Sequence, residues 1–73
     1  MPDVYVESGP KGRDEHEAIN HYVLESAGNK IVDDVRHRTR ETAINAAKRL
    51  RHNPLVARVR VTDKGTASYW RAA

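Results

Sequence analysis

Cysteine and phenylalanine are absent from this 73-residue sequence, and its aromatic residues are limited to three tyrosines and one tryptophan. Without cysteine there is no disulfide, no thiolate zinc site and no cysteine nucleophile. A chain this short buries only about 60% of the surface that it exposes when unfolded, so its apolar core must be small. We therefore expect a single small domain, residues 1–73, that forms a homodimer to bury further apolar surface.

Long hydrophobic runs are also missing. No stretch approaches the roughly 18 apolar residues that a membrane-spanning helix needs, and the first residues lack the apolar segment of a signal peptide. We therefore expect a cytoplasmic protein with no membrane partner. The lack of cysteine is compatible with the reducing conditions of that compartment.

Charge, in contrast, is plentiful and unevenly distributed. Residues 1–35 contain eight acidic and three basic residues, whereas residues 36–60 contain eight Lys or Arg and a single acid, Glu41. Arginine outnumbers lysine nine to four. The guanidinium group offers bidentate contacts to phosphate or carboxylate, although genome composition also enriches arginine. This asymmetry points to an acidic partner, either nucleic acid or an acidic protein surface.

The first half of the chain fits two arrangements. Residues 3–8 alternate in polarity like a short strand, and a polar segment broken by glycine and proline follows at residues 9–17. Residues 14–28 have the capping pattern and periodicity of a helix. The same region also fits a hairpin in which residues 21–26 pair with residues 30–37. These local signals favour neither arrangement.

The second half predicts a helix and two strands. Thr39 is a good N-cap for an alanine-rich helix over residues 39–52. Asn53-Pro54 would end it, because proline disfavours helical geometry in the preceding residue. The polarity period then changes to two from Leu55, and residues 67–72 can return as a last strand.

The small residues on the helix indicate that it lies close to a sheet. A strand that begins at Leu55 would direct Leu55 and Ala57 to one face and Arg58 and Arg60 to the other. Because the helix covers only one face, we expect Arg58 and Arg60 to lie on the uncovered one.

Residues 21–50 resemble the small bacterial and archaeal YegP-like domains, which are related to other domains of unknown function. The matching positions are Gly28, Ile31 and Val32 in the hairpin and Thr39, Ala43, Ile44 and Ala47 in the helix. Tyr22 stands where those domains usually have tryptophan, and residues 67–73 are additional. The resemblance implies a β-β-β-α-β order, frequent dimers and no established activity, so no functional residue is carried over. It favours the hairpin.

We therefore expect an α+β fold. A small antiparallel sheet of about five strands would carry one alanine-rich helix, residues 39–52, on one face. The leading functional hypothesis is a non-enzymatic basic module that contacts nucleic acid or another acidic partner. The contact residues would be Arg36, Arg38, Arg40, Lys48, Arg49, Arg51, Arg58 and Arg60. The cations near the helix C-terminus also have a purely structural explanation, because the helix dipole stabilises them.

Two aromatic residues near the end of the chain also have two interpretations. Tyr69 and Trp70 could stack on single-stranded bases beside the arginines of the neighbouring strand. In a protein with so few large apolar groups they could equally belong to the core or to a dimer contact. The alternative function is a homodimeric protein–protein interaction module, such as an accessory or inhibitor protein of a mobile element, without nucleic-acid binding.

Catalytic and metal-binding patterns are missing from the sequence. The four histidines have no metal-ligand spacing, although Asp33 and His37 would share one strand face. Asp33 and Asp34 are adjacent, so in a strand their side chains point to opposite faces and cannot act as a carboxylate pair. We expect no enzyme, no cofactor, no metal and no small-molecule substrate.

Overall fold

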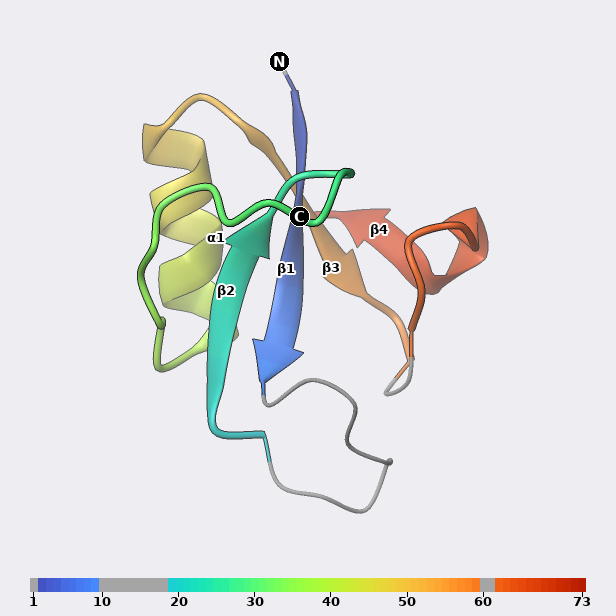
Figure 1. Ribbon diagram of the computed structural model, residues 1–73, viewed down its shortest axis with the longest axis horizontal. Helices are drawn as coiled ribbons and strands as arrows, with labels where there is room; N and C mark the ends of the chain where they lie inside the picture. Colours follow the sequence, from blue (N-terminus) through green and yellow to red (C-terminus); the bar gives the residue numbers. More distant parts are fainter. Residues whose placement is uncertain (1, 10–18, 60–61) are drawn as a thin grey trace.

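The computed structural model describes residues 2–9, 19–59 and 62–73. The elements are β1 (Asp3–Gly9), β2 (His21–Glu25), α1 (Arg40–Arg49), β3 (Asn53–Ala57), the short 3-10 helix η1 (Ala67–Tyr69) and β4 (Trp70–Ala72). The four strands found in these residues form one sheet in the order β2-β1-β3-β4, and α1 packs on one face of it (Figure 1). The small α+β fold with a single helix on a sheet is confirmed.

The sheet is mixed, so the prediction of about five antiparallel strands is only roughly met. β1 pairs antiparallel with β2, and β3 pairs antiparallel with β4, but β1 and β3 are parallel, with Val6 opposite Val56. The reason lies in the crossover, because α1 returns the chain to the end of the sheet where β1 begins. The two strands at the centre of the sheet are therefore about fifty residues apart in sequence; for example, the side-chain Nδ2 of Asn53 donates to Asp3 Oδ1 over 2.9 Å.

The hairpin is present only in part. Residues 21–25 are a strand, which excludes a helix there, while residues 10–18 lie outside the described part of the chain. The returning segment touches β2 through two isolated bridges, Tyr22 with His37 and Glu25 with Ile31. Between these bridges Asp34 has a positive φ of 55°, which interrupts extended geometry. The structure thus has β-β-α-β-β order rather than the β-β-β-α-β order that the resemblance implies.

The core lies between α1 and the sheet. Its buried residues are Val4, Val6, Leu24, Ala43, Ala46, Ala47 and Val56. The alanines carry only a methyl group, so the helix backbone can approach the valines of the central strands closely. This packing confirms the role predicted for the alanine-rich stripe.

The face assignment predicted for β3 is wrong. Val56 is fully buried in the core under α1, so its neighbours Leu55 and Ala57 point to the opposite face. The cause is the parallel register with β1, which aligns Val56 with Val6 in the core. Arg58 is exposed just beyond the end of β3, and Arg60 lies outside the described residues.

Helix α1 begins as the sequence predicts and ends earlier. The Thr39 hydroxyl accepts a hydrogen bond from the Thr42 amide at 3.1 Å, and the Thr42 hydroxyl accepts one from the Thr39 amide at 3.3 Å. The helix ends at Arg49 and not at residue 52, because Arg51 turns into the left-handed region with φ 61°. The next amide, of His52, then donates back to the Ala47 carbonyl at 2.9 Å. Glycine is the usual residue at such a position.

Replacing Arg51 with glycine should therefore relieve the left-handed backbone. We expect Arg51→Gly to exceed Arg51→Ala in free energy of unfolding by about 1 kcal/mol, because alanine keeps the steric penalty that glycine lacks. Both variants lose the same charge at the helix C-terminus, so their difference isolates the backbone. Urea denaturation followed by Trp70 fluorescence measures it, and equal midpoints for the two variants would contradict the assignment.

Candidate functional site

The sheet face away from α1 carries an aromatic pair. Tyr5 and Trp70 meet edge to face, with ring centroids 4.8 Å apart and an interplanar angle of 79°. Trp70 is 8% exposed, and its indole nitrogen donates to the Asp63 carbonyl at 2.9 Å. Tyr69 is half-buried in η1. Trp70 is thus part of the packing of this face, which limits the stacking surface that it can offer.

Lys64 occupies the middle of the same face. Its ammonium nitrogen lies 2.9 Å from Glu7 Oε2, 3.0 Å from Glu25 Oε1 and 2.6 Å from Asn29 Oδ1. The nitrogen also lies 5.4 Å from the centroid of the Tyr5 ring. The Glu25 side chain is 3% exposed and that of Lys64 14%, so the charges meet largely out of water. We call Lys64, Glu7, Glu25 and Asn29 the lysine clamp.

The clamp sets the protonation state of its lysine. Burial alone would lower the pKa of Lys64, but the hydrogen bonds and negative charges of Glu7 and Glu25 outweigh it, so the pKa is raised above 10.5. The ammonium is therefore a permanent cation at neutral pH. A lysine held in this way serves as a counterion and not as a nucleophile.

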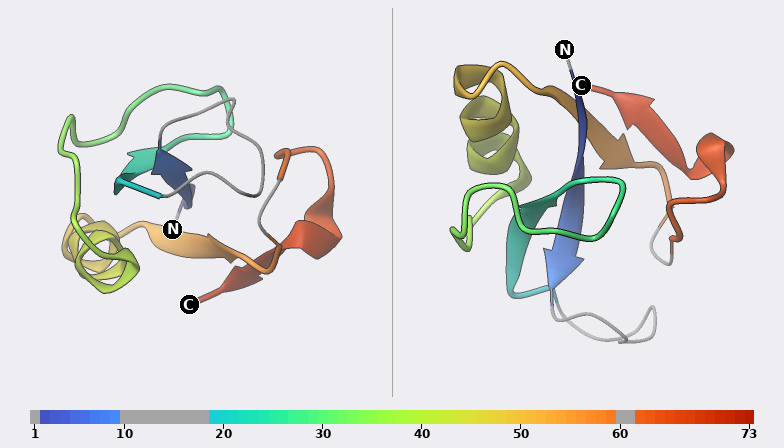
Figure 2. Two further views of the ribbon diagram at one scale, coloured as in Figure 1. Left: turned by 90° about the horizontal axis from the view of Figure 1, so that it is seen from below. Right: turned by 45° about the horizontal axis from the view of Figure 1, so that its top comes forward.

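Seven of the eight predicted contact residues lie in the described part of the chain, and all seven are exposed: Arg36, Arg38, Arg40, Lys48, Arg49, Arg51 and Arg58. They form two groups rather than one patch. The first three lie at or just before the N-terminus of α1, and Lys48, Arg49 and Arg51 lie at its C-terminal end. Arg58 directly follows β3, and β3 ends at the end of the sheet where the helix begins (Figure 2).

Within the described residues none of these seven cations has an acidic partner. Among these side chains in the described chain, that of Arg40 makes a cation–π contact, with its guanidinium carbon 6.0 Å from the centroid of the Tyr22 ring. In the described chain Glu7 and Glu25 pair with Lys64 instead, and Asp33 hydrogen-bonds to His37. The exposed cations are therefore available to an external anion.

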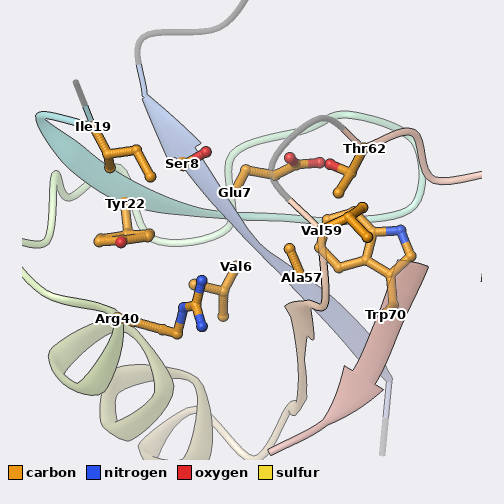
Figure 3. Close-up of a pocket in the computed structure, with 10 residues that line it drawn as sticks. All are labelled: Val6, Glu7, Ser8, Ile19, Tyr22, Arg40, Ala57, Val59, Thr62 and Trp70. Carbon is orange, nitrogen blue, oxygen red and sulfur yellow. The ribbon is translucent and has the colours of Figure 1, made fainter. Parts of the chain in front are cut away.

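A shallow hollow opens where β1 and β3 diverge (Figure 3). Its lining residues are Val6, Glu7, Ser8, Ile19, Tyr22, Arg40, Ala57, Val59, Thr62 and Trp70. The empty space amounts to about 330 Å³ when its open mouth is included, while the enclosed part, about 20 Å³, has room for about one water molecule.

The predicted proximity of Asp33 and His37 is present as a hydrogen bond. His37 Nε2 lies 2.8 Å from Asp33 Oδ2, with both side chains largely buried. The pair fastens the returning segment beside β2, where the His37 amide donates to the Tyr22 carbonyl at 2.7 Å. No group of three or more potential metal ligands occurs among the described residues, and none of their helices is long and apolar enough to cross a membrane.

The chain matches no protein family model, no curated protein and no solved structure. The similarity to YegP-like domains therefore stays a prediction.

The lysine clamp is the feature that sequence reasoning missed. Lys64 is not among the residues that the sequence predicted to be functional, and Glu7 and Glu25 were counted only among the eight acids of residues 1–35. One signal was available, because each acid interrupts an otherwise apolar strand and, in alternation, shares the face of an apolar neighbour such as Tyr5. The clamp joins three segments that are far apart in the sequence: β1, the end of β2 with the turn after it, and the segment before β4. The fold decides which of their residues meet.

Removing the clamp cation should strongly destabilise the protein. We expect Lys64→Met to lower the free energy of unfolding by about 3 kcal/mol, because Glu7 and Glu25 would lose their shared counterion. Adding Glu7→Gln to that variant should restore part of the loss, since one unpaired carboxylate disappears. Urea denaturation measures both effects. Lys30→Met, which removes an exposed lysine, is the control and should change the value by less than about 0.5 kcal/mol.

Alkaline pH should weaken the clamp. Because the folded-state pKa of Lys64 is raised above 10.5, its contribution is complete below that value and is lost as the pH rises through the folded pKa. The stability gap between the wild type and Lys64→Met should therefore narrow above about pH 10.5. Denaturation of both proteins between pH 7 and 11.5 tests this, and a gap that widens with pH would contradict it.

Proposed function

We propose that this protein is a non-enzymatic binding module that contacts nucleic acid through its exposed cations. The basic surface comprises Arg36, Arg38, Arg40, Lys48, Arg49, Arg51 and Arg58, with Arg60 as an expected addition. The observation that supports the proposal is that all seven described members are exposed and lack an acidic partner within the described chain. Exposed arginines without internal partners suit a phosphate backbone, which accepts bidentate contacts.

The distribution of the acids strengthens this proposal. Glu7 and Glu25 are engaged by Lys64, and Asp33 is engaged by His37. Three acids of residues 1–35 thus have internal partners, and in the described chain none of these three pairs with the cations around α1. Glu41, in the first turn of α1, is the single acid between residues 36 and 60.

The spacing of the two cation groups suits an extended anionic ligand. A ten-residue helix is about 15 Å long, so the groups at its two ends are separated by several phosphates of a nucleic-acid strand. Affinity would come mainly from the release of counterions from the nucleic acid and would fall steeply with salt. No reaction forms part of this proposal, because the enclosed volume of the hollow cannot sequester a substrate from water.

A homodimer is the second candidate, and one observation favours it. β4 lies at the edge of the sheet and pairs only with β3 among the described strands. An edge of this kind can add a strand from another copy. The engagement of Glu7 and Glu25 by Lys64 argues against the other dimer mode, in which the acidic half of one copy would face the basic half of another.

Salt dependence and charge removal test the leading proposal. We expect fluorescence anisotropy to show binding of labelled single- and double-stranded oligonucleotides that weakens by at least tenfold between about 50 and 200 mM salt. The variant Lys48→Gln/Arg49→Gln/Arg51→Gly should bind at least tenfold more weakly at the lower salt, because three cations are lost while Arg51→Gly relieves the backbone.

The matched control removes charge elsewhere. Lys30→Gln/Arg71→Gln eliminates two exposed cations outside the basic surface and should reduce affinity much less. Equal losses of binding free energy per cation removed in the two variants would indicate general attraction by net charge rather than a defined surface. A concentration-dependent dimer mass together with no oligonucleotide binding at low salt would favour the second candidate.

A further inference from the structure

The hollow lies at the end of the sheet where β1 and β3 end and α1 begins. The ladder between β1 and β3 ends at Val6 and Val56, and beyond this pair the two parallel strands separate. Their carboxyl ends face the same way as the N-terminus of α1, which Arg40 begins. Three further arginines of the basic surface, Arg36, Arg38 and Arg58, belong to this end of the sheet. In sheets with parallel strands, this end is where ligands commonly bind.

The lining combines flat and apolar groups. Figure 3 places Tyr22 on one side of the hollow and Trp70 on the other, with Val6 and Ala57 between them. Val59 lies beside the indole ring in the same view. An aromatic wall facing an apolar floor accepts the face of a planar ring, because stacking needs surface contact and not a fixed hydrogen-bond pattern.

The charge at the hollow is positive. Arg40 is exposed at its mouth, with its guanidinium over the Tyr22 ring, and has no acidic partner among the described residues. The single acid in the lining, Glu7, is bound by Lys64 at 2.9 Å. A ligand that enters the hollow therefore meets an available guanidinium and a carboxylate that is already ion-paired with a lysine, which it shares with Glu25.

A planar ring with an attached anion satisfies both features. We propose that the hollow receives one unstacked base of a single-stranded nucleic acid against Tyr22, while Arg40 binds an adjacent phosphate. This inference rests on the proposed function and goes beyond it, because it assigns a strand preference. In a duplex the bases are stacked and paired, so they cannot enter, whereas a single strand can present an unstacked base. The ring would lie in the open mouth of the hollow, because the enclosed part has room for about one water molecule.

The single tryptophan of the protein provides a local signal, because Trp70 lines the hollow. We would titrate the protein with a pyrimidine homopolymer, with the same strand annealed in a duplex, and with a strand of equal length that contains abasic positions. Phosphate content per nucleotide is the same in the intact and abasic strands, so only the base contact differs. The intact single strand should change Trp70 emission in parallel with anisotropy, and the other two should change anisotropy alone.

Variants at Tyr22 separate stacking from folding. Tyr22→Phe keeps the aromatic face and should bind the single strand within about twofold of the wild type, whereas Tyr22→Leu should bind it about tenfold more weakly. Arg40→Gln should lower single-strand affinity more than Arg71→Gln does. Circular dichroism and urea midpoints identify any loss of folding, and Tyr22→Phe preserves the test if Tyr22→Leu is unstable.

The outcomes distinguish the two proposals. Salt-dependent binding with unchanged Trp70 emission, and with equal affinity for intact and abasic strands, would overturn the base site and leave the basic surface standing. Complete absence of oligonucleotide binding at low salt would remove both. Base-dependent emission changes that are lost in Tyr22→Leu and kept in Tyr22→Phe would establish the site.

Discussion

The ammonium group of Lys64 is the contact on which the second face of this sheet depends. It joins Glu7 of β1, Glu25 of β2 and Asn29 of the following turn to the segment that leads into β4. In the described chain this face carries an ion-paired cluster and an aromatic pair instead of a second apolar core. Such a cluster is sensitive to any substitution that unbalances its charges.

The two faces of the sheet are thus stabilised in different ways. On one face, alanines and valines hold α1 close to the central strands. On the other, Lys64 offsets part of the negative charge of Glu7 and Glu25, which would otherwise repel an anionic partner more strongly. The remaining cations lie around α1 and beyond β3, so the internal compensation of the acids and the external availability of the arginines are parts of one charge arrangement.

Local signals in the sequence predicted the local structure well. The sequence predicted Thr39 as N-cap, the alanine stripe of the helix and a strand that follows the helix near Pro54, because each depends on neighbouring residues. The parallel pairing of β1 with β3 was not readable, since it depends on the path of the crossover. The basic residues of the candidate site could be named from composition, but the hollow could not, because its walls come from five separated segments.

The parallel pairing at the centre of the sheet also constrains how the protein folds during synthesis. During synthesis β1 lacks its second neighbour until β3 has been made about fifty residues later, as the Asp3–Asn53 contact indicates. The clamp closes later still, when Lys64 emerges. Non-local contacts of this kind slow folding, so the acidic early half of the chain, which is self-repelling, would help to keep the nascent segment from pairing with other strands.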